Sequence, residues 1–237
     1  PLENTGRFPL MTEFQWDWAF AWEILPTLLW AFRITLAATV AGMALALVGG
    51  MILALMRRSR FFFISYPTGF VIEFLRSTPL LVQLFFLYFV LPEAGIELDP
   101  PFLLATVALG MHYSAYTSEI YRSGIEGVPK GQWEAARALN FSTPQTWIKI
   151  ILPQAIPPVI PALGNRFIAM FKDTPMLMVI GLVEVLSAAD AIRSDEFRSI
   201  EPYTLVGVIF LVASLLSAGG IQLLERKLAI PGTRHEG

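Results

Sequence analysis

The sequence predicts an all-α fold, a polytopic membrane helix bundle of about five transmembrane helices. Hydrophobic residues make up 55% of the 237-residue chain and charged residues only 15%, whereas soluble domains carry roughly 25% charged residues. The mean hydropathy is +0.59. Several apolar runs also reach the length of about 20 residues that a helix needs to cross a hydrocarbon core.

Five segments are the candidate spans. Three are uninterrupted apolar runs, at 34–56, at 77–91 extended back through Gly69, and at 202–224. Two more, at 100–118 and 150–171, contain His112 and Arg166, which is typical of helices that face other helices. In the first span small residues recur every fourth position and predict a close packing face: Ala38, Gly42, Ala46 and Gly50.

The amino-terminal segment, 1–25, is expected to be extracytoplasmic and interfacial. Its tryptophans suit the boundary between lipid and water. It has no basic region followed by an apolar region, so no cleavable signal peptide is predicted. The chain contains no cysteine, which excludes disulfides and thiolate metal sites. His112 has no second ligand at metal spacing, so we expect a hydrogen-bonded histidine in the bundle and no metal.

Basic residues predict the orientation, because short loops rich in arginine and lysine stay in the cytoplasm. With five spans, the basic loops all lie on one side: Arg57, Arg58 and Arg60, then Arg122, Lys130, Arg137 and Lys149, then Arg226 and Lys227. Acidic residues prevail in the opposite loops. We therefore expect the N-terminus outside and the C-terminus inside.

The polar segment 129–153 stands between long apolar stretches. Trp133, Ala136 and Leu139 recur at helical spacing and predict a short amphipathic helix over 131–139. Ser142, with Gln145 three residues later, is a capping-box pattern that begins a second short helix. The two helices would form a rigid knob able to fit a groove on a soluble partner.

The spacing in this segment resembles the loop of bacterial ABC importer permeases, which runs Glu-Ala-Ala, three residues, Gly, nine residues, then Ile-x-Leu-Pro. The matching residues are Glu134, Ala135, Ala136, Ile150, Leu152 and Pro153. Asn140 stands where the family has Gly, and Asn tolerates the left-handed conformation of a helix end better than other non-glycine residues. Gly131 and Leu139 complete the predicted ATPase-coupling loop.

Nearly the whole chain, from about 26 to 226, is similar to permeases for polar amino acids. The similar stretches include 118–126, 129–136 and 172–175. Within that group, 131–133 and 153–163 look most like permeases for ectoine and hydroxyectoine. The resemblance implies a type I ABC importer transmembrane domain over 26–228 in a bacterial cytoplasmic membrane, followed by a cytoplasmic tail at 229–237.

The resemblance also implies partners. They are two ABC ATPase subunits, an extracytoplasmic solute-binding protein, the lipid bilayer, and either a second copy of the chain or a homologous permease. The chain has no Gly-x-x-x-x-Gly-Lys-Ser/Thr, so ATP and Mg belong on the ATPase and this chain is expected to be no enzyme and to bind no cofactor. Nucleic acid is not expected as a partner.

Polar residues at membrane depth are candidates for the solute pathway. Glu73 and Arg76 form either a gate or a packing ion pair. Tyr116 and Glu119 belong to a polar cluster that would be wasteful facing lipid. After the loop, four more polar residues occur at expected membrane depth: Asn165, Lys172, Asp173 and Thr174. They either line the solute pathway or only hold two half-helices together.

For a small zwitterion, Glu119, Asp173 or Asn165 could face the cation, and Arg76, Arg166 or Lys172 the carboxylate. The prolines at 153, 157, 158 and 161 predict a broken helix.

Two other function classes fit less well. A secondary carrier or channel would use Glu119, Asp173 and His112 as a relay, but no internal repeat is visible. An intramembrane enzyme would need a pattern such as His-Glu-x-x-His or Gly-x-Ser-x-Gly, and the sequence contains neither.

Overall fold

The computed structural model describes residues 16–228, and within them the chain is helical, without strands. This confirms the all-α fold class. Residues 1–15 of the expected interfacial segment and the expected tail at 229–237 lie outside the described residues. The α-helices are α1 (Trp18–Arg57), α2 (Phe62–Ser77), α3 (Leu80–Phe85), α4 (Pro101–Glu126), α5 (Lys130–Ala138), α6 (Thr143–Thr146), α7 (Leu152–Asp173), α8 (Val185–Glu196) and α9 (Ile200–Leu228).

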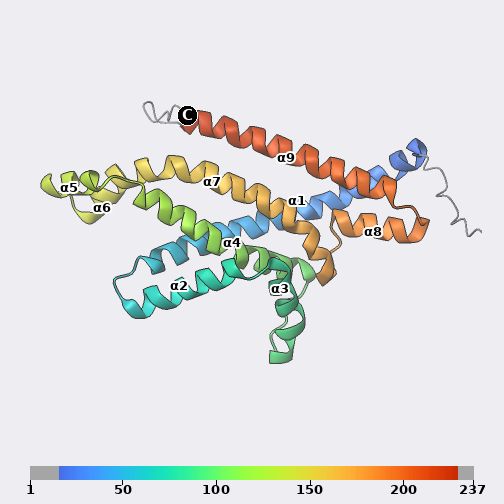
Figure 1. The fold of residues 1–237 in the computed structure, drawn as a ribbon, viewed down its shortest axis with the longest axis horizontal. Helices are drawn as coiled ribbons and strands as arrows, with labels where there is room; N and C mark the ends of the chain where they lie inside the picture. Colours follow the sequence, from blue (N-terminus) through green and yellow to red (C-terminus); the bar gives the residue numbers. More distant parts are fainter. Residues whose placement is uncertain (1–15, 229–237) are drawn as a thin grey trace, which may run out of the picture.

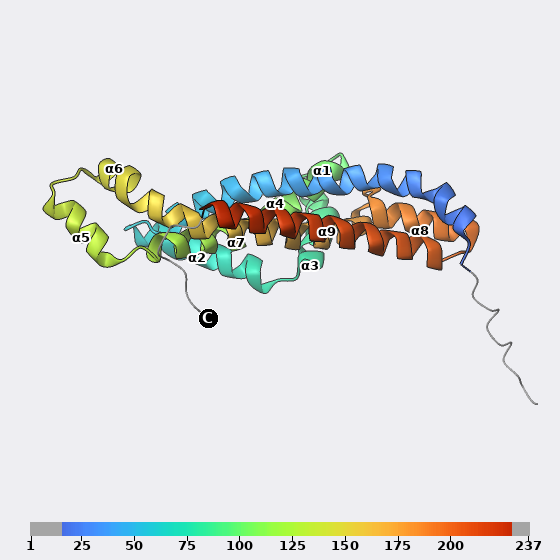
Figure 2. The same ribbon diagram turned by 90° about the horizontal axis from the view of Figure 1, so that it is seen from above.

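Helices α1, α4, α7 and α9 run side by side along the long axis of the molecule (Figures 1 and 2). By length and apolar composition, α1, the stretch Thr143–Ile180 and α9 can cross a membrane, and α2 with the segment after it could form a fourth crossing. Helix α4 has 26 residues, about 39 Å at 1.5 Å per residue. It is therefore long enough to be the fifth span, although its C-terminal half is polar.

The second predicted span is bent rather than straight. Helix α2 ends at Ser77, and the helical segment Leu80–Ala94 leaves it at an angle of 106°. Thr78 is extended, with φ −105° and ψ 136°, because a residue before proline is pushed out of the helical region. The prediction of one continuous helix across 69–91 is therefore wrong, and Pro79 is the physical reason.

The predicted break at the prolines after the loop is also wrong. Helix α7 is continuous from Leu152 to Asp173, with Pro157, Pro158 and Pro161 inside it. The proline ring holds φ near the helical value, so each proline removes a hydrogen bond without forcing the chain out of the helix. The irregular turns lie at the two ends of α7 instead: the π-helical turn η3 (Trp147–Ile151) and the 3-10 helix η4 (Thr174–Ile180).

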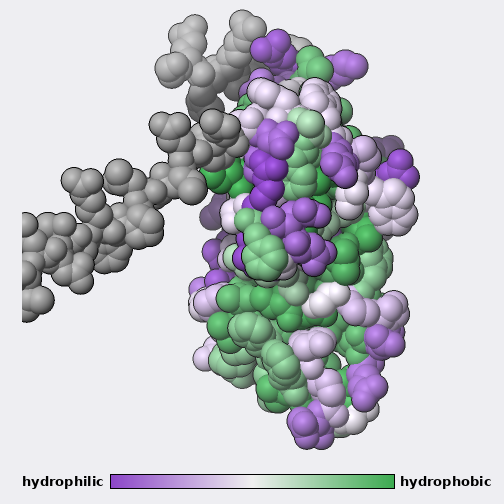
Figure 3. Space-filling model, turned by 90° about the vertical axis from the view of Figure 1, so that its right-hand side faces the viewer, coloured by the Kyte–Doolittle hydropathy of each residue, from purple (hydrophilic) through white to green (hydrophobic). Residues whose placement is uncertain are grey.

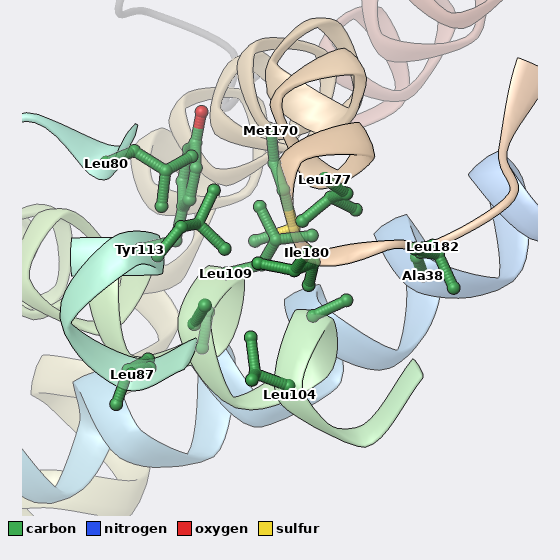
Figure 4. Close-up of a cluster of buried hydrophobic side chains, with 14 of the residues drawn as sticks. Ala38, Leu80, Leu87, Leu104, Leu109, Tyr113, Met170, Leu177, Ile180 and Leu182 are labelled. Atoms are coloured by element: carbon green, nitrogen blue, oxygen red, sulfur yellow. The ribbon is translucent and has the colours of Figure 1, made fainter. Parts of the chain in front are cut away.

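The small-residue stripe of α1 packs directly on α4, as predicted. A Cβ on Gly42 would lie 2.8 Å from the Cβ of Leu109, so only glycine permits this approach. The Thr117 hydroxyl donates to the Ala46 carbonyl across the same contact, over 2.7 Å. Around it lies the main hydrophobic core, formed by α1, α3, α4, α7 and η4 (Figure 4).

A polar clasp joins the starts of α1 and α9 at the end of the bundle seen in Figure 3. We define it as Asp17, Arg198 and Glu201. The Arg198 guanidinium donates to Asp17 over 3.0 Å and to Glu201 over 2.5 Å. Asp17 also accepts from the Phe20 backbone N–H. That hydrogen bond and the Arg198 guanidinium hold the pKa of Asp17 below its ordinary value of 3.8.

Candidate functional site

Two short helices, α5 and α6, project from the other end of the bundle (Figure 2). We call residues 130–151 the knob. The Ser142 hydroxyl accepts from the Gln145 N–H, and the Gln145 side chain accepts from the Ser142 N–H, which confirms the predicted capping box. Asn140, between the two helices, has φ +57°. It therefore takes the left-handed conformation expected of a residue standing in place of glycine.

The knob has a small apolar core of its own. The rings of Trp133 and Trp147 meet edge to face, with centroids 5.3 Å apart. Ala136 is fully buried. Ile151 and Val128 pack together against the two tryptophan rings. This core fixes α5 against the turn that leads into α7, so the knob packs as one piece with the start of that helix.

The candidate coupling residues separate into two groups. Ala136 points into the knob, so it supports the shape of the loop. The Leu139 side chain is 67% exposed. A leucine this exposed is unusual in a polar segment such as the knob. The remaining candidates are exposed as well: Gly131, Glu134, Ala135 and Asn140 on the knob, and Leu152 and Pro153 where α7 begins.

An open cavity of about 930 Å³ lies between α4 and α7, next to the knob. It brings together three predicted pathway residues, Arg76, Tyr116 and Glu119, with Arg166, which the sequence offered as a partner for a carboxylate. A neighbouring cavity of about 640 Å³ includes Glu73. The other predicted pathway residues, Asn165, Lys172, Asp173 and Thr174, do not line either cavity.

Two guanidinium groups lie against the Tyr116 ring. The Arg166 Cζ is 4.8 Å from the ring centroid and the Arg76 Cζ is 5.7 Å from it. Guanidinium groups within about 6 Å of an aromatic centroid are attracted by the ring quadrupole. We call Arg76, Tyr116 and Arg166 the arginine stack. The three residues come from α2, α4 and α7, so the stack exists only through tertiary packing.

The carboxylates near the arginine stack already have partners. Glu119 accepts two hydrogen bonds from Arg122, over 2.6 and 3.1 Å, one turn further along α4. Glu73 pairs with Arg76 over 3.5 Å, as predicted, but its side chain is 69% exposed. Exposed pairs of this kind contribute little. Arg122 also lines the cavity and was outside the set of predicted site residues.

Asp173 accepts from the Tyr113 hydroxyl over 2.7 Å. Lys172, its neighbour in sequence, is exposed and forms no ion pair within residues 16–228. Thr174 is fully buried, and its hydroxyl donates to the Phe171 carbonyl. Asn165 is exposed. These four residues therefore do not form one cluster. Of the four, only Asp173 has a side-chain hydrogen bond to another span within residues 16–228.

His112 fastens the bent span to α4. Its Nδ1 lies 3.2 Å from Gln83 Oε1, which confirms the predicted hydrogen-bonded histidine. The Gln83 amide donates in turn to the carbonyls of Leu75 and Thr78, beside the bend. Gln83 is a buried linking residue that hydropathy passed over, although a single amide side chain in the apolar run 79–91 is a usable signal.

Comparison with known proteins decides the family. Residues 46–230 match the family described as "Binding-protein-dependent transport system inner membrane component". The chain belongs to this family. It is 44% identical to the probable amino-acid ABC transporter permease protein y4tG of Sinorhizobium fredii, over 91% of this chain and 95% of that one. It is 34% identical to the glutamine transport system permease protein GlnP of Escherichia coli, over 91% and 99%.

A solved structure supports the same assignment. This permease superimposes with a TM-score of 0.85 on a chain from the crystal structure of an amino acid ABC transporter with histidines, with 35% identity over 90% of this chain and 100% of that chain. The fold is therefore that of a type I ABC importer permease. The chain is a multi-pass permease subunit of a binding-protein-dependent amino acid importer, and its relatives are transport permeases rather than enzymes.

Proposed function

We propose that this permease carries a polar amino acid, or a compatible solute such as ectoine or hydroxyectoine, into a bacterial cell, driven by two separate ATPase subunits. The observation that carries the proposal is the position of the cavity beside the knob. Three residues separate the end of α4 from the knob, and α7 begins directly after the knob. The same two helices line the cavity.

This arrangement supplies a mechanism for coupling. ATP binding would close the two ATPase subunits and displace the knob that each permease inserts into them. Because the knob packs as one piece with the start of α7, its displacement moves α7 relative to α4. The cavity between them then opens toward one side of the membrane or the other, and solute and ATP shift the population of the two arrangements.

The cavity is open on one side, and a second subunit is needed to close it. Arg76 and Arg166 are exposed on the open side of the cavity, and charges at membrane depth are costly in contact with lipid. A second copy of the chain, or a homologous permease, covers this side in the proposed assembly. Two-fold assemblies are the commonest arrangement of soluble oligomers, and the same closed symmetry would cover the cavity here.

We propose the orientation from the same geometry. Arg57 and Arg58 end α1 at the knob end of the bundle, and Arg226 and Lys227 end α9 there (Figure 1). Short loops rich in arginine remain cytoplasmic, so the knob and C-terminus face the ATPase inside the cell. The α8 end, with the polar clasp, then faces the solute-binding protein. The domain bounds 26–228 and the coupling loop 129–153 form part of this proposal.

The test is purification from the native membrane in mild detergent, followed by identification of the co-purifying proteins and reconstitution in liposomes. We expect two ATPase subunits per permease pair, and ATP hydrolysis stimulated by a receptor loaded with solute. Labelled glutamine and ectoine, supplied in parallel, distinguish an amino acid from a compatible solute. A chain that purifies alone and moves solute down an ion gradient without ATP would show a secondary carrier instead.

A further inference from the structure

We infer that the arginine stack is a carboxylate-binding site in the transport pathway, and that this permease is selective for an amino acid with a second carboxylate. The inference rests on the proposed function and narrows its substrate to a dicarboxylic amino acid. Its basis is that Arg76 and Arg166 meet the same ring inside the cavity, while Glu119 is bound by Arg122 and Glu73 offers Arg76 only an exposed contact of 3.5 Å.

The stack lies far from the knob along the bundle axis. Arg76 is fourteen residues beyond the start of α2, and Arg166 is fourteen residues beyond the start of α7. At 1.5 Å per residue both lie about 21 Å from the knob-side ends of their helices. A hydrocarbon core is about 30 Å thick. Two guanidinium groups at this depth are costly unless an anion accompanies them.

The protein does not supply that anion. Within residues 16–228 Arg166 forms no ion pair, and Arg76 has only the long contact to exposed Glu73. Arg122 donates two hydrogen bonds to one carboxylate oxygen of Glu119, Oε2. The free charge on this wall of the cavity is therefore positive, and a solute must bring the negative charge.

The chemistry of the stack fits carboxylates. A guanidinium group presents parallel N–H donors that match the two oxygens of a carboxylate, and it cannot be deprotonated in proteins. Both groups lie within about 6 Å of the Tyr116 ring centroid, and this contact uses the ring face and leaves their N–H donors for the solute. Two such groups can hold two carboxylates of one small molecule.

Selectivity follows from counting charges. A dicarboxylic amino acid such as glutamate brings one carboxylate for each arginine, while its single ammonium group is common to all the amino acids compared. A neutral amino acid or ectoine brings one carboxylate and leaves the second arginine without a partner. A basic amino acid adds a further cation beside two like charges, which is repulsive at short range. We expect the order of affinity to be glutamate first, glutamine and ectoine next, and arginine last.

The test is equilibrium binding of labelled L-glutamate to the purified permease with its co-purifying partners in nanodiscs, with L-glutamine, ectoine and L-arginine as competitors. We expect each competitor to bind at least about tenfold more weakly than glutamate, since a hydrogen-bonded charge is worth a factor of about ten to a hundred. Arg166→Gln and Arg76→Gln should lose a similar factor for glutamate, and Arg166→Lys should recover part of it.

Arg33→Gln is the matched control, because it removes another exposed arginine that neither lines the cavity nor touches Tyr116. It should change glutamate affinity less than twofold. The inference is overturned if glutamine, ectoine or arginine binds as tightly as glutamate, if Arg33→Gln loses as much as Arg166→Gln, or if glutamate does not bind.

Co-purification reports on the proposed function separately. A complex that contains ATPase subunits but binds no glutamate overturns only this inference. A chain that purifies without an ATPase overturns the proposed function, and the glutamate measurement is made on it in the same way.

Discussion

The hydroxyl of Tyr113, in the middle of α4, donates a hydrogen bond over 2.7 Å to the carboxylate of Asp173, at the end of α7. In Figure 4 the Tyr113 ring lies among the apolar side chains of the core, with its hydroxyl directed out of them. Helices α4 and α7 are joined again through the knob at their other ends. The two helices are therefore linked at two places, by this hydrogen bond and through the knob, and the cavity of about 930 Å³ lies between them.

Removing the hydrogen bond between Tyr113 and Asp173 should weaken the attachment of α7 to α4. Tyr113→Phe leaves Asp173 without its donor, and hydrogen bonds to charged groups contribute about 1.5–3 kcal/mol. We expect the purified protein to unfold several degrees earlier in a thermal scan. Tyr116→Phe is the control, because that hydroxyl makes only a long contact of 3.4 Å to the Arg76 carbonyl. Equal shifts for the two variants would contradict the assignment.

The exposed side of the knob should bind the ATPase. Glu134→Lys and Leu139→Ser change side chains that touch solvent, so thermal stability should remain within about 0.5 kcal/mol of wild type. Co-purification of the ATPase and coupled uptake should fall at least severalfold. Glu196→Lys, an exposed charge reversal on α8, should leave the ATPase bound. Normal coupled uptake by both knob variants would refute the coupling role.

The buried side of the knob should respond differently. Ala136→Asp places a carboxylate in a fully buried position of the knob core, and an unpaired buried charge is strongly destabilising. We expect faster cleavage of residues 130–151 in limited proteolysis as well as loss of the ATPase. A knob that resists protease like the wild type would show that Ala136 tolerates the charge.

Asn140 should tolerate glycine and reject β-branched residues. Its φ of +57° costs an ordinary L-residue about 1–2 kcal/mol. Asn140→Gly should therefore be neutral or stabilising, whereas Asn140→Val should make the knob more sensitive to protease. Ala138→Val, on exposed helical backbone two residues earlier, controls for β-branching alone. If both valine variants behave alike, the left-handed conformation is not the cause.

Gly42 should not accept even one methyl group. The added Cβ of Gly42→Ala would meet the Cβ of Leu109 at 2.8 Å, and overpacking of this kind costs about 1–3 kcal/mol. Gly207→Ala is the matched control, since nothing lies within 4 Å of its added Cβ on α9. Thermal unfolding in detergent measures both. A Gly42→Ala protein as stable as Gly207→Ala would mean that α1 and α4 are less closely packed.

The polar clasp should weaken in acid. Asp17 has a folded-state pKa below 3.8, so its contribution is complete above that value and is lost as the pH falls through the lower, folded-state value. Arg198→Gln should remove the same contribution at neutral pH and speed amide exchange at the start of α1. Arg193→Gln, whose partner is Asp190 on the same helix, should leave that exchange unchanged.

Local features of the chain could be predicted because they depend on neighbours in sequence. The capping box joins Ser142 to Gln145, and the left-handed turn depends on Asn140 alone. The packing stripe on α1 repeats every four residues. Hydropathy likewise predicts how many residues lie in membrane-spanning helices, but it does not predict where a helix bends or stays straight. The bend at Pro79 and the continuity of α7 therefore needed the backbone geometry.

The sequence by itself determined the helical class, the presence of the spans and the internal form of the knob, because hydrophobicity and short-range hydrogen bonds act within one segment. Only the tertiary structure decided which polar residues meet. Arg76, Tyr116 and Arg166 lie on three helices, and their meeting depends on how each helix is rotated about its axis. That rotation is set by packing such as Gly42 on Leu109, which joins residues far apart in the chain.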